Sequence, residues 1–348
     1  MNGGRRVLWS GLAILASLVA APAWAQDSDR AGSILLYPLY DATAGAGTIM
    51  CVTNTNTETT YCPSSDQRIG DVLLHYLYVD GDTWQEFDRY EFLTPGDTLC
   101  VIASEHNLDR GRGFLVVTSH NPNGGDLAQF DHLIGSAILV ESDLNFLWTY
   151  AAYAMRSGGT NDSCTVLDPD AVINGGDGDG VPDYDTVEYT GFPETLMIDT
   201  FFEEGGAHDF MNKLTLFTTV GAAYDVEVDV LFFNNIEQKF SRNFSFTCWQ
   251  STALSDISAV ARSLGGDEEE FGRQTETGWA RLVGARIIDG AGNPVLRTDG
   301  AVAVPPLLGV FMQGINGSNF SFGKGLHMEG ELDGLEIERG DGDPQTVL

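Results

Sequence analysis

Short apolar segments recur along this chain, and Gly, Asn, Asp or Pro separates each one from the next. In the first part of the chain they occupy residues 33–40, 48–53, 72–79, 84–92, 98–103, 113–119 and 134–140. The third segment runs directly into Asp80-Gly81, a pair that favours a tight hairpin turn. About seven short strands at this spacing predict an antiparallel β-sandwich.

A similar series returns in the second part, at residues 213–219, 226–233, 240–246, 278–283, 301–304 and 307–311. Asn234-Asn235 follows the second of these segments, as Asp80-Gly81 follows 72–79. Gly278-Trp279 likewise corresponds to Gly113-Phe114. We interpret this as an internal repeat, from an old duplication or from two modules of one type. The alternative is that any two sandwiches share their turn spacing.

The predicted fold is therefore all-β, with two antiparallel, immunoglobulin-like β-sandwich domains joined by an Asp/Gly-rich segment. The predicted boundaries are a signal peptide at 1–25, a first sandwich at 26–143, a linker at 144–195, a second sandwich at 196–335 and an acidic tail at 336–348. Within the linker, residues 144–155 are apolar and fit either a helix or a long strand. The architecture resembles secreted bacterial immunoglobulin-like sandwich proteins that have no assigned activity.

The N-terminus has the three parts of a secretory signal. Arg5 and Arg6 precede a nearly unbroken apolar run at 7–21, and Ala23-Trp24-Ala25 places small residues before a cleavage site. A retained membrane anchor is the alternative, but a run of about 15 residues is shorter than the ~20 that a spanning helix needs. We expect export to the periplasm or beyond, a mature chain that begins at Gln26, and no transmembrane segment after the signal is removed.

Acidic residues outnumber basic ones by 50 to 18, which gives a formal net charge of −32. A chain this acidic repels nucleic acids and anionic lipid head groups, so we expect no nucleic-acid partner. The charge either attracts cations and basic partners or simply keeps the protein soluble.

Five cysteines suit disulfide formation in an oxidising compartment, and the odd number leaves at least one thiol over. A bridge from Cys51 to Cys62 would close a short polar loop, and Cys51 to Cys100 is the alternative. No CxxC pair occurs, so neither a thiol-redox motif nor a zinc knuckle is supported.

Alternating aspartates in a Gly-rich stretch, residues 174–186, are the strongest chemical signal. Calcium prefers six to eight oxygen ligands in a flexible loop, and Gly180 permits a sharp turn. The stretch resembles the calcium loops of thrombospondin type-3 repeats. That resemblance implies a Ca²⁺ site, with ligands from this set: Asp177, Asp179, the Val181 carbonyl, Asp183 and Asp185. The alternative is an acidic linker that binds nothing tightly.

Other candidate groups are less specific. His106, His120 and His132 fall in or beside predicted loops and could meet in space, whereas His75 lies within a predicted strand. His208-Asp209 follows Glu203-Glu204, so a metal cluster there is conceivable. Aromatic residues on a sheet face would bind sugar rings, and Trp84 and Trp249 lie nearest to turns, but core packing is the simpler interpretation.

The chain contains no Gly-x-Ser-x-Gly elbow and no phosphate-binding loop in a strand–helix context, and its many carboxylates single out no catalytic pair. We therefore expect an exported, non-catalytic structural or binding protein, stabilised by calcium, whose partner is a glycan, a protein at the cell surface or its own copies. Two alternatives are a carbohydrate-active enzyme or glycan-binding module, and a self-assembling surface subunit.

Overall fold

The structure is a computed structural model of the chain. It describes residues 30–332 except 64, 110, 124, 126, 142–145, 158–163, 165–183, 185–188, 205–207, 263, 265–275, 298–299, 317, 319–320 and 331. Strands dominate this part of the chain, and every pairing between them is antiparallel. The predicted all-β class is confirmed.

The first half of the protein forms two sheets, a five-stranded one in the order β4-β3-β6-β1-β9 and a four-stranded one in the order β5-β2-β7-β8. Their elements are β1 (Ile34–Asp41), β2 (Ala46–Asn54), β3 (Val72–Asp80), β4 (Glu86–Leu93), β5 (Thr98–Ile102), α1 (Ala103–His106), β6 (Arg112–His120), β7 (Leu133–Glu141), β8 (Phe146–Ala151) and β9 (Tyr153–Met155). The sheets pack face to face, and the Tyr37 hydroxyl on β1 donates to the Cys51 carbonyl on β2 at 2.9 Å.

The second half forms two further sheets, in the orders β13-β12-β15-β10-β18 and β14-β11-β16-β17. Their elements are β10 (Thr195–Phe202), β11 (Phe210–Phe217), β12 (Asp225–Asn234), β13 (Lys239–Phe246), β14 (Trp249–Ala253), α2 (Leu254–Ile257), the 3₁₀ turn η1 (Ala259–Arg262), β15 (Thr277–Ile288), β16 (Leu308–Ile315), β17 (Ser321–Gly325) and β18 (His327–Glu329). When β10 to β18 are matched in turn with β1 to β9, the strand orders in the two halves are the same.

Irregular features of the backbone also occur at matching places. The β1–β6 ladder shifts register between Tyr37 and Tyr40, and the β10–β15 ladder shifts between Ile198 and Phe201. The β3–β4 turn contains Trp84 at φ 63°, and the β12–β13 turn contains Glu237 at φ 64°. The strand pairing therefore shows, for most strand positions, which residue of the first half corresponds to which residue of the second half.

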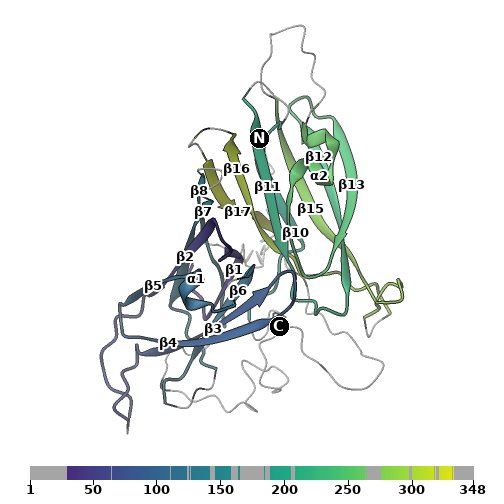
Figure 1. Cartoon of the computed structure of the whole chain (residues 1–348). Coiled ribbons are helices and arrows are strands. Elements are labelled where there is room, and N and C mark those ends of the chain that lie inside the picture. Colours follow the sequence, from purple (N-terminus) through teal and green to yellow (C-terminus); the bar gives the residue numbers. More distant parts are fainter. Residues whose placement is uncertain are drawn as a thin grey trace, which may run out of the picture.

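The four sheets follow one another through the molecule (Figure 1). The first four-stranded sheet packs on the first five-stranded sheet, whose strand β1 lies against β11 and β16 of the second four-stranded sheet. The second five-stranded sheet covers the other side of that sheet, where β10 lies against β11 and β16. Strands β8 and β17, at the edges of the two four-stranded sheets, also run beside each other.

Sequence patterns match these positions in the stack. Strands β1 and β16 read as almost continuous apolar runs, and nearly every residue in them is buried because both faces are covered. Strand β8 alternates strictly between buried and exposed residues because one face is open, and β12 alternates between fully buried and more accessible residues.

Two predicted segments differ from the structure. Residues 146–155, which the sequence pattern places in a linker, extend the first two sheets as β8 and β9. The predicted strand at 301–304 is wrong. Only Val302 takes part in an isolated bridge, with Leu296, because the chain there turns back on itself in a short exposed excursion after β15.

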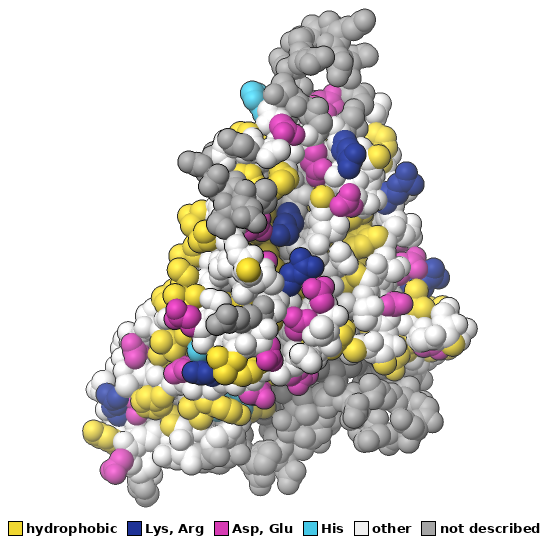
Figure 2. Space-filling view, viewed as in Figure 1, with side chains coloured by type: hydrophobic (Ala, Val, Ile, Leu, Met, Phe, Trp, Pro, Cys, Tyr) yellow, Lys and Arg dark blue, Asp and Glu magenta, His cyan; other side chains and the backbone are white. Residues whose placement is uncertain are grey.

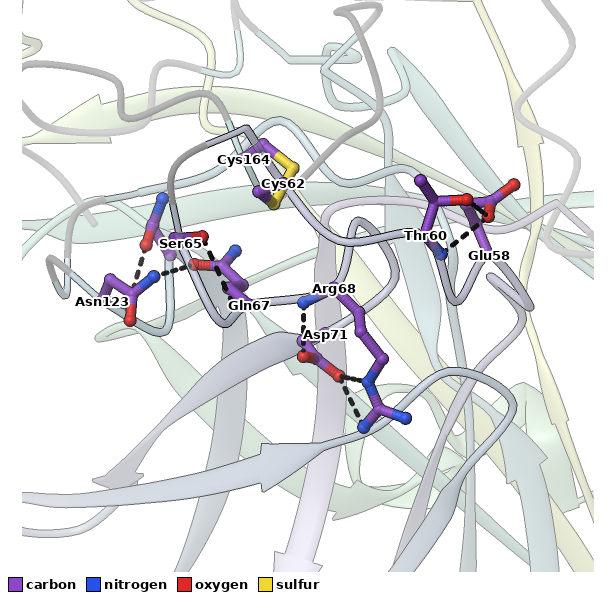
Figure 3. The surroundings of a disulfide bond; sticks show 10 residues. Glu58, Thr60, Cys62, Ser65, Gln67, Arg68, Asp71, Asn123 and Cys164 are labelled. Atoms are coloured by element: carbon purple, nitrogen blue, oxygen red, sulfur yellow. Dashed lines mark hydrogen bonds and ion pairs between the residues drawn. A yellow bond between two sulfur atoms is a disulfide. The ribbon is translucent and has the colours of Figure 1, made fainter.

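The disulfides also differ from the favoured prediction. Cys51 and Cys100 lie directly opposite each other on β2 and β5, with Cα atoms 4.0 Å apart, and they form a disulfide. The Cys51–Cys62 bridge is therefore wrong, and the alternative pairing is confirmed. Cys62 instead bonds to Cys164, beside the Gln67–Asn123 hydrogen bond and the Arg68–Asp71 ion pair (Figure 3). Among the described residues, no helix is long and apolar enough to cross a membrane.

Candidate functional site

The two halves of the protein pack against each other through the outer faces of two sheets. Phe114 on the outer face of the first five-stranded sheet stacks on Phe217 of β11, with ring centroids 4.9 Å apart. The Trp249 indole N–H donates to the Pro38 carbonyl at 2.9 Å, and the Tyr153 hydroxyl donates to the Gly309 carbonyl. Residues of both halves therefore belong to one continuous buried core.

This contact is close-packed at its margin as well. A Cβ on Gly81 would collide with the Trp249 indole, and the Arg112 guanidinium lies 5.7 Å from the centre of the Trp249 ring. Lys213 forms an ion pair with Glu141, and its Nζ lies 2.9 Å from Oε1. The outer face of the second four-stranded sheet thus has an apolar area around Phe217, Trp249 and Val310, which the first five-stranded sheet covers, and polar positions at Lys213, Thr215 and Ser251.

The corresponding face of the first four-stranded sheet has no such cover among the described residues. We call it the uncharged face. Its outward positions are Gly47, Ile49, Cys51, Thr53, Thr98, Cys100, Ile102, Ile134, Ser136, Ile138, Val140, Leu147, Thr149 and Ala151. None of them is charged, in a chain with 50 acidic and 18 basic residues. Four large apolar side chains are exposed: Ile102 (43%), Ile134 (42%), Val140 (40%) and Leu147 (55%).

Hydrophobic side chains gather along this flank in the space-filling view, on the left in Figure 2. Scattered single apolar residues are ordinary on a protein surface, but a contiguous apolar patch marks an interaction site. The exposed apolar residues here occupy neighbouring strands of one sheet, and the Cys51–Cys100 disulfide joins its edge strand β5 to β2. The uncharged face therefore combines four exposed large apolar side chains with outward positions that carry no charge.

A second open face lies at the other end of the stack, on the outside of the second five-stranded sheet. We call it the aromatic face. Phe233 and Trp279 pair across β12 and β15 and stack with ring centroids 4.1 Å apart and planes 4° from parallel. Leu231, Arg281 and Met197 continue the same face in register. Trp279 is 37% exposed, although its counterpart in the first half, Phe114, is buried.

Several charged groups of the aromatic face form ion pairs or hydrogen bonds. Glu227 pairs with Arg286 at 2.8 Å, and Asp199 pairs with Lys324. Near the centre, the Arg281 guanidinium donates to the Thr195 hydroxyl at 3.1 Å. The middle of this face therefore combines aromatic and aliphatic side chains with the Arg281 guanidinium and the exposed Asp229 carboxylate, which accepts a hydrogen bond from Asn243.

His106 and His120 lie on opposite sides of the first five-stranded sheet. The predicted cluster of His106, His120 and His132 is therefore wrong, because these two side chains do not meet. His120 instead lies beside His75 and Tyr90 on the outer side, with the two imidazole centroids 5.5 Å apart. His75 Nε2 lies 2.7 Å from the Asp88 carboxylate. His106 lies on the inner side, because side chains alternate between the faces of a strand and α1 folds back over the sheet.

Two buried groups have shifted pKa values. Burial lowers the pKa of His106, whose Nδ1 lies 2.8 Å from the Tyr78 hydroxyl, and the nearby Glu91 carboxylate partly opposes this effect. Burial raises the pKa of the Cys248 thiol, which donates to the Val220 carbonyl at 3.1 Å. Cys248 is the unpaired cysteine, and it is therefore a packed core residue.

The predicted calcium ligands Asp177, Asp179, Val181, Asp183 and Asp185 lie outside the described residues. Within the described part of the chain, no group of three or more His, Cys, Asp or Glu residues could hold a metal ion. The positions of Trp84 and Trp249 fit the core-packing interpretation and not sugar stacking. Trp249 is 5% exposed because the first half covers it, and Trp84 packs against the core.

Sequence reasoning missed both open faces, although one signal was present. The alternate positions 47, 49, 51 and 53, and 134, 136, 138 and 140, carry no charge, where an outward strand face normally carries several. The signal can be used only when it is known which alternate residues of each strand point outward, and that depends on how the sheets pack.

Comparisons with known proteins add little to this geometry. No protein-family model matches the chain, and no curated protein matches it. One solved structure that aligns with it is titled "Crystal Structure of Thermotoga maritima 1070". The alignment covers 41% of this chain and 99% of that chain at 9% identity, with a TM-score of 0.25. The class that the fold defines is an all-β protein of face-to-face antiparallel sheets, and a likeness of that size adds nothing more specific.

Proposed function

We propose that this protein is an exported, non-catalytic structural or binding protein that associates with another protein surface through the uncharged face. The observation that carries the proposal is the absence of charge from the outward positions of four neighbouring strands in a chain of net charge −32. An uncharged, partly apolar sheet face costs solubility when it is left in water, and burial against a partner removes that cost.

The second four-stranded sheet supports this interpretation. Its outer face also contains an apolar area, and within the chain that area is buried against a neighbouring sheet. We propose that the two halves are copies of one sandwich module, a proposal supported by their matching strand orders, register shifts and turns. On that basis the outer face of the four-stranded sheet is a packing surface in both copies. In the first half, the surface that covers it belongs to another molecule.

Export and calcium are further parts of the proposal. The two disulfides are compatible with an oxidising compartment, and the N-terminal sequence supports secretion. Residues 174–186 support a Ca²⁺ site on sequence grounds. The account as a whole predicts that the chain recovered from the cell envelope begins at Gln26.

Site-specific photocrosslinking in the cells that make the protein tests the proposed function. A photoreactive amino acid replaces Ile102 on the uncharged face, and the control replaces Leu296, an equally apolar residue that is 52% exposed outside either open face. We expect a discrete crosslinked protein from position 102 and none from position 296. If position 102 captures nothing in cells where the protein is folded and exported, the proposed function is wrong.

A further inference from the structure

The proposed function leaves open which protein surface meets the uncharged face. The four sheets alternate in the order four, five, four and five strands, and each sheet contacts the next. Their contacts are head-to-tail, because a four-stranded face always meets a five-stranded one. The stack therefore ends in two different faces, the uncharged face at one end and the aromatic face at the other.

The chain already contains one copy of the contact that would join such ends. In its middle, the outer face of a four-stranded sheet covers the outer face of a five-stranded sheet. The two open faces stand in the corresponding positions. In Figure 1 they lie on opposite sides of the molecule, with β2, β5 and β7 on the left and β12, β13 and β15 on the right. A contact of this heterologous kind propagates from copy to copy when both of its surfaces remain free.

We propose that the aromatic face of one molecule binds the uncharged face of a second copy, so that the chains assemble head-to-tail. This inference rests on the proposed function, since it names the partner of the same surface. It extends the stack of sheets across molecules by repeating the sheet-on-sheet part of the contact that the chain makes within itself; β8 and β17 already lie beside each other within the chain and take no part in the repeat.

The sizes of matched side chains support this pairing. Within the chain, the four-stranded side of the contact has the bulky Phe217 and Trp249, which pair in register. Thr53 and Thr98, which pair in the same way on β2 and β5, occupy the corresponding place on the uncharged face. On the five-stranded side, it is the open face that has the larger side chains.

On that side, Val79 and Phe114 pair in the covered face, and the larger Phe233 and Trp279 pair in the aromatic face. At these two matched pairs, small residues on one open face correspond to large residues on the other, as close packing between the two requires.

Charge is sparse across this contact, because the uncharged face contributes none. On the aromatic face, Glu227 and Asp199 are paired with Arg286 and Lys324, and Asp229, which is exposed on β12, accepts a hydrogen bond from the Asn243 side chain. The hydroxyls of Thr53, Thr98 and Ser136 offer acceptors to the Arg281 guanidinium. Elsewhere the surfaces of two copies repel each other, because each carries a net charge of −32. Salt screens that repulsion and leaves apolar contact intact, so assembly increases with ionic strength.

Sedimentation velocity of residues 26–348 over a concentration series, in about 0.05 and about 0.5 M salt, tests the inference. We expect species larger than a dimer that grow with concentration and with salt. Ile138→Arg on the uncharged face and Trp279→Arg on the aromatic face should each abolish them. Leu296→Arg, the same kind of change outside both faces, should not. If either first variant fails to fold by circular dichroism, Ile134→Arg or Leu231→Arg replaces it.

Three outcomes of the sedimentation experiment overturn the inference. A strict monomer at every concentration does so, and assembly that persists in both face variants does so as well. A dimer that is lost in Ile138→Arg and unaffected by Trp279→Arg shows two uncharged faces meeting each other, which excludes head-to-tail order. In the crosslinking experiment, capture of a different protein at position 102 leaves the proposed function standing and overturns self-assembly, whereas capture of nothing removes both.

Discussion

At the scale of single residues, Cys248 shows how the structure changes the meaning of a sequence feature. An odd cysteine in an exported protein suggests a reactive thiol or an intermolecular bridge. Here the thiol is 1% exposed, its pKa is raised by burial, and both disulfides exclude it. The leftover cysteine therefore serves as a small core residue.

A thiol titration checks this assignment. The thiolate is the reactive form, and burial suppresses both its formation and its access to reagents. We expect no reaction of the native protein with a chromogenic disulfide reagent, and about one thiol per chain in guanidinium without reductant. Three thiols in guanidinium would mean that one of the two disulfides is absent, and rapid reaction of the native protein would mean that Cys248 is accessible.

His106 gives a prediction about pH. Its folded-state pKa lies below the ordinary value of 6.5, chiefly because the imidazole is buried. The unfolded chain therefore binds a proton at His106 more readily, so the free energy of unfolding falls as the pH drops through 6.5. We expect His106→Gln to lose less stability than wild type between pH about 7.5 and about 5.5, measured by urea unfolding. An equal loss in both proteins would show that His106 is not responsible.

At the scale of elements, the sequence predicts most strands but not which distant segments pack against each other. Apolar segments bounded by Gly, Asn and Asp locate β1 to β7 closely, because turn chemistry is local. Strand β14 begins at Trp249, which the sequence pattern presents as a residue near a turn and the structure buries against the first half. Its environment depends on a partner more than 200 residues away, since Pro38 accepts its indole N–H.

The fit of Trp249 can be tested through the glycine beneath it. A Cβ on Gly81 would lie 3.0 Å from Trp249 Cγ and closer still to Cε3 and Cδ2 of the indole, whereas a Cβ on Gly47 would meet nothing within 4 Å. We expect Gly81→Ala to lower the free energy of unfolding by about 1–3 kcal/mol, as overpacking does, and Gly47→Ala to leave it almost unchanged. Equal effects of the two substitutions in urea unfolding would mean that the halves do not meet as described.

The Asp-rich loop at 174–186 gives a prediction that rests on its sequence alone. A ligand at ~100 times its dissociation constant adds about 2.7 kcal/mol to the free energy of unfolding, which raises the melting temperature by a few degrees. We expect calcium to produce such a rise relative to chelator, and Asp179→Ala to remove it. A melting temperature that is the same with calcium and with chelator would reduce the loop to an acidic linker.

At the scale of the whole molecule, the two open faces follow from the order in which the sheets stack. Each of the two halves has a four-stranded and a five-stranded outer face, and one contact within the chain covers one of each. The sequence predicts the all-β class and the similarity in spacing between the halves. It does not predict which faces meet, because residues such as Phe114 and Phe217 belong to different halves and neither segment alone specifies the pairing.

Sedimentation of an equimolar mixture of the Ile138→Arg and Trp279→Arg proteins tests the head-to-tail account most directly. Each variant keeps one intact face, and the two intact faces are complementary. The account predicts that each protein alone is a monomer and that the mixture forms a dimer that grows no further, since both outer ends of that dimer are blocked. A mixture that remains monomeric, at concentrations where the wild-type chain assembles, would contradict it.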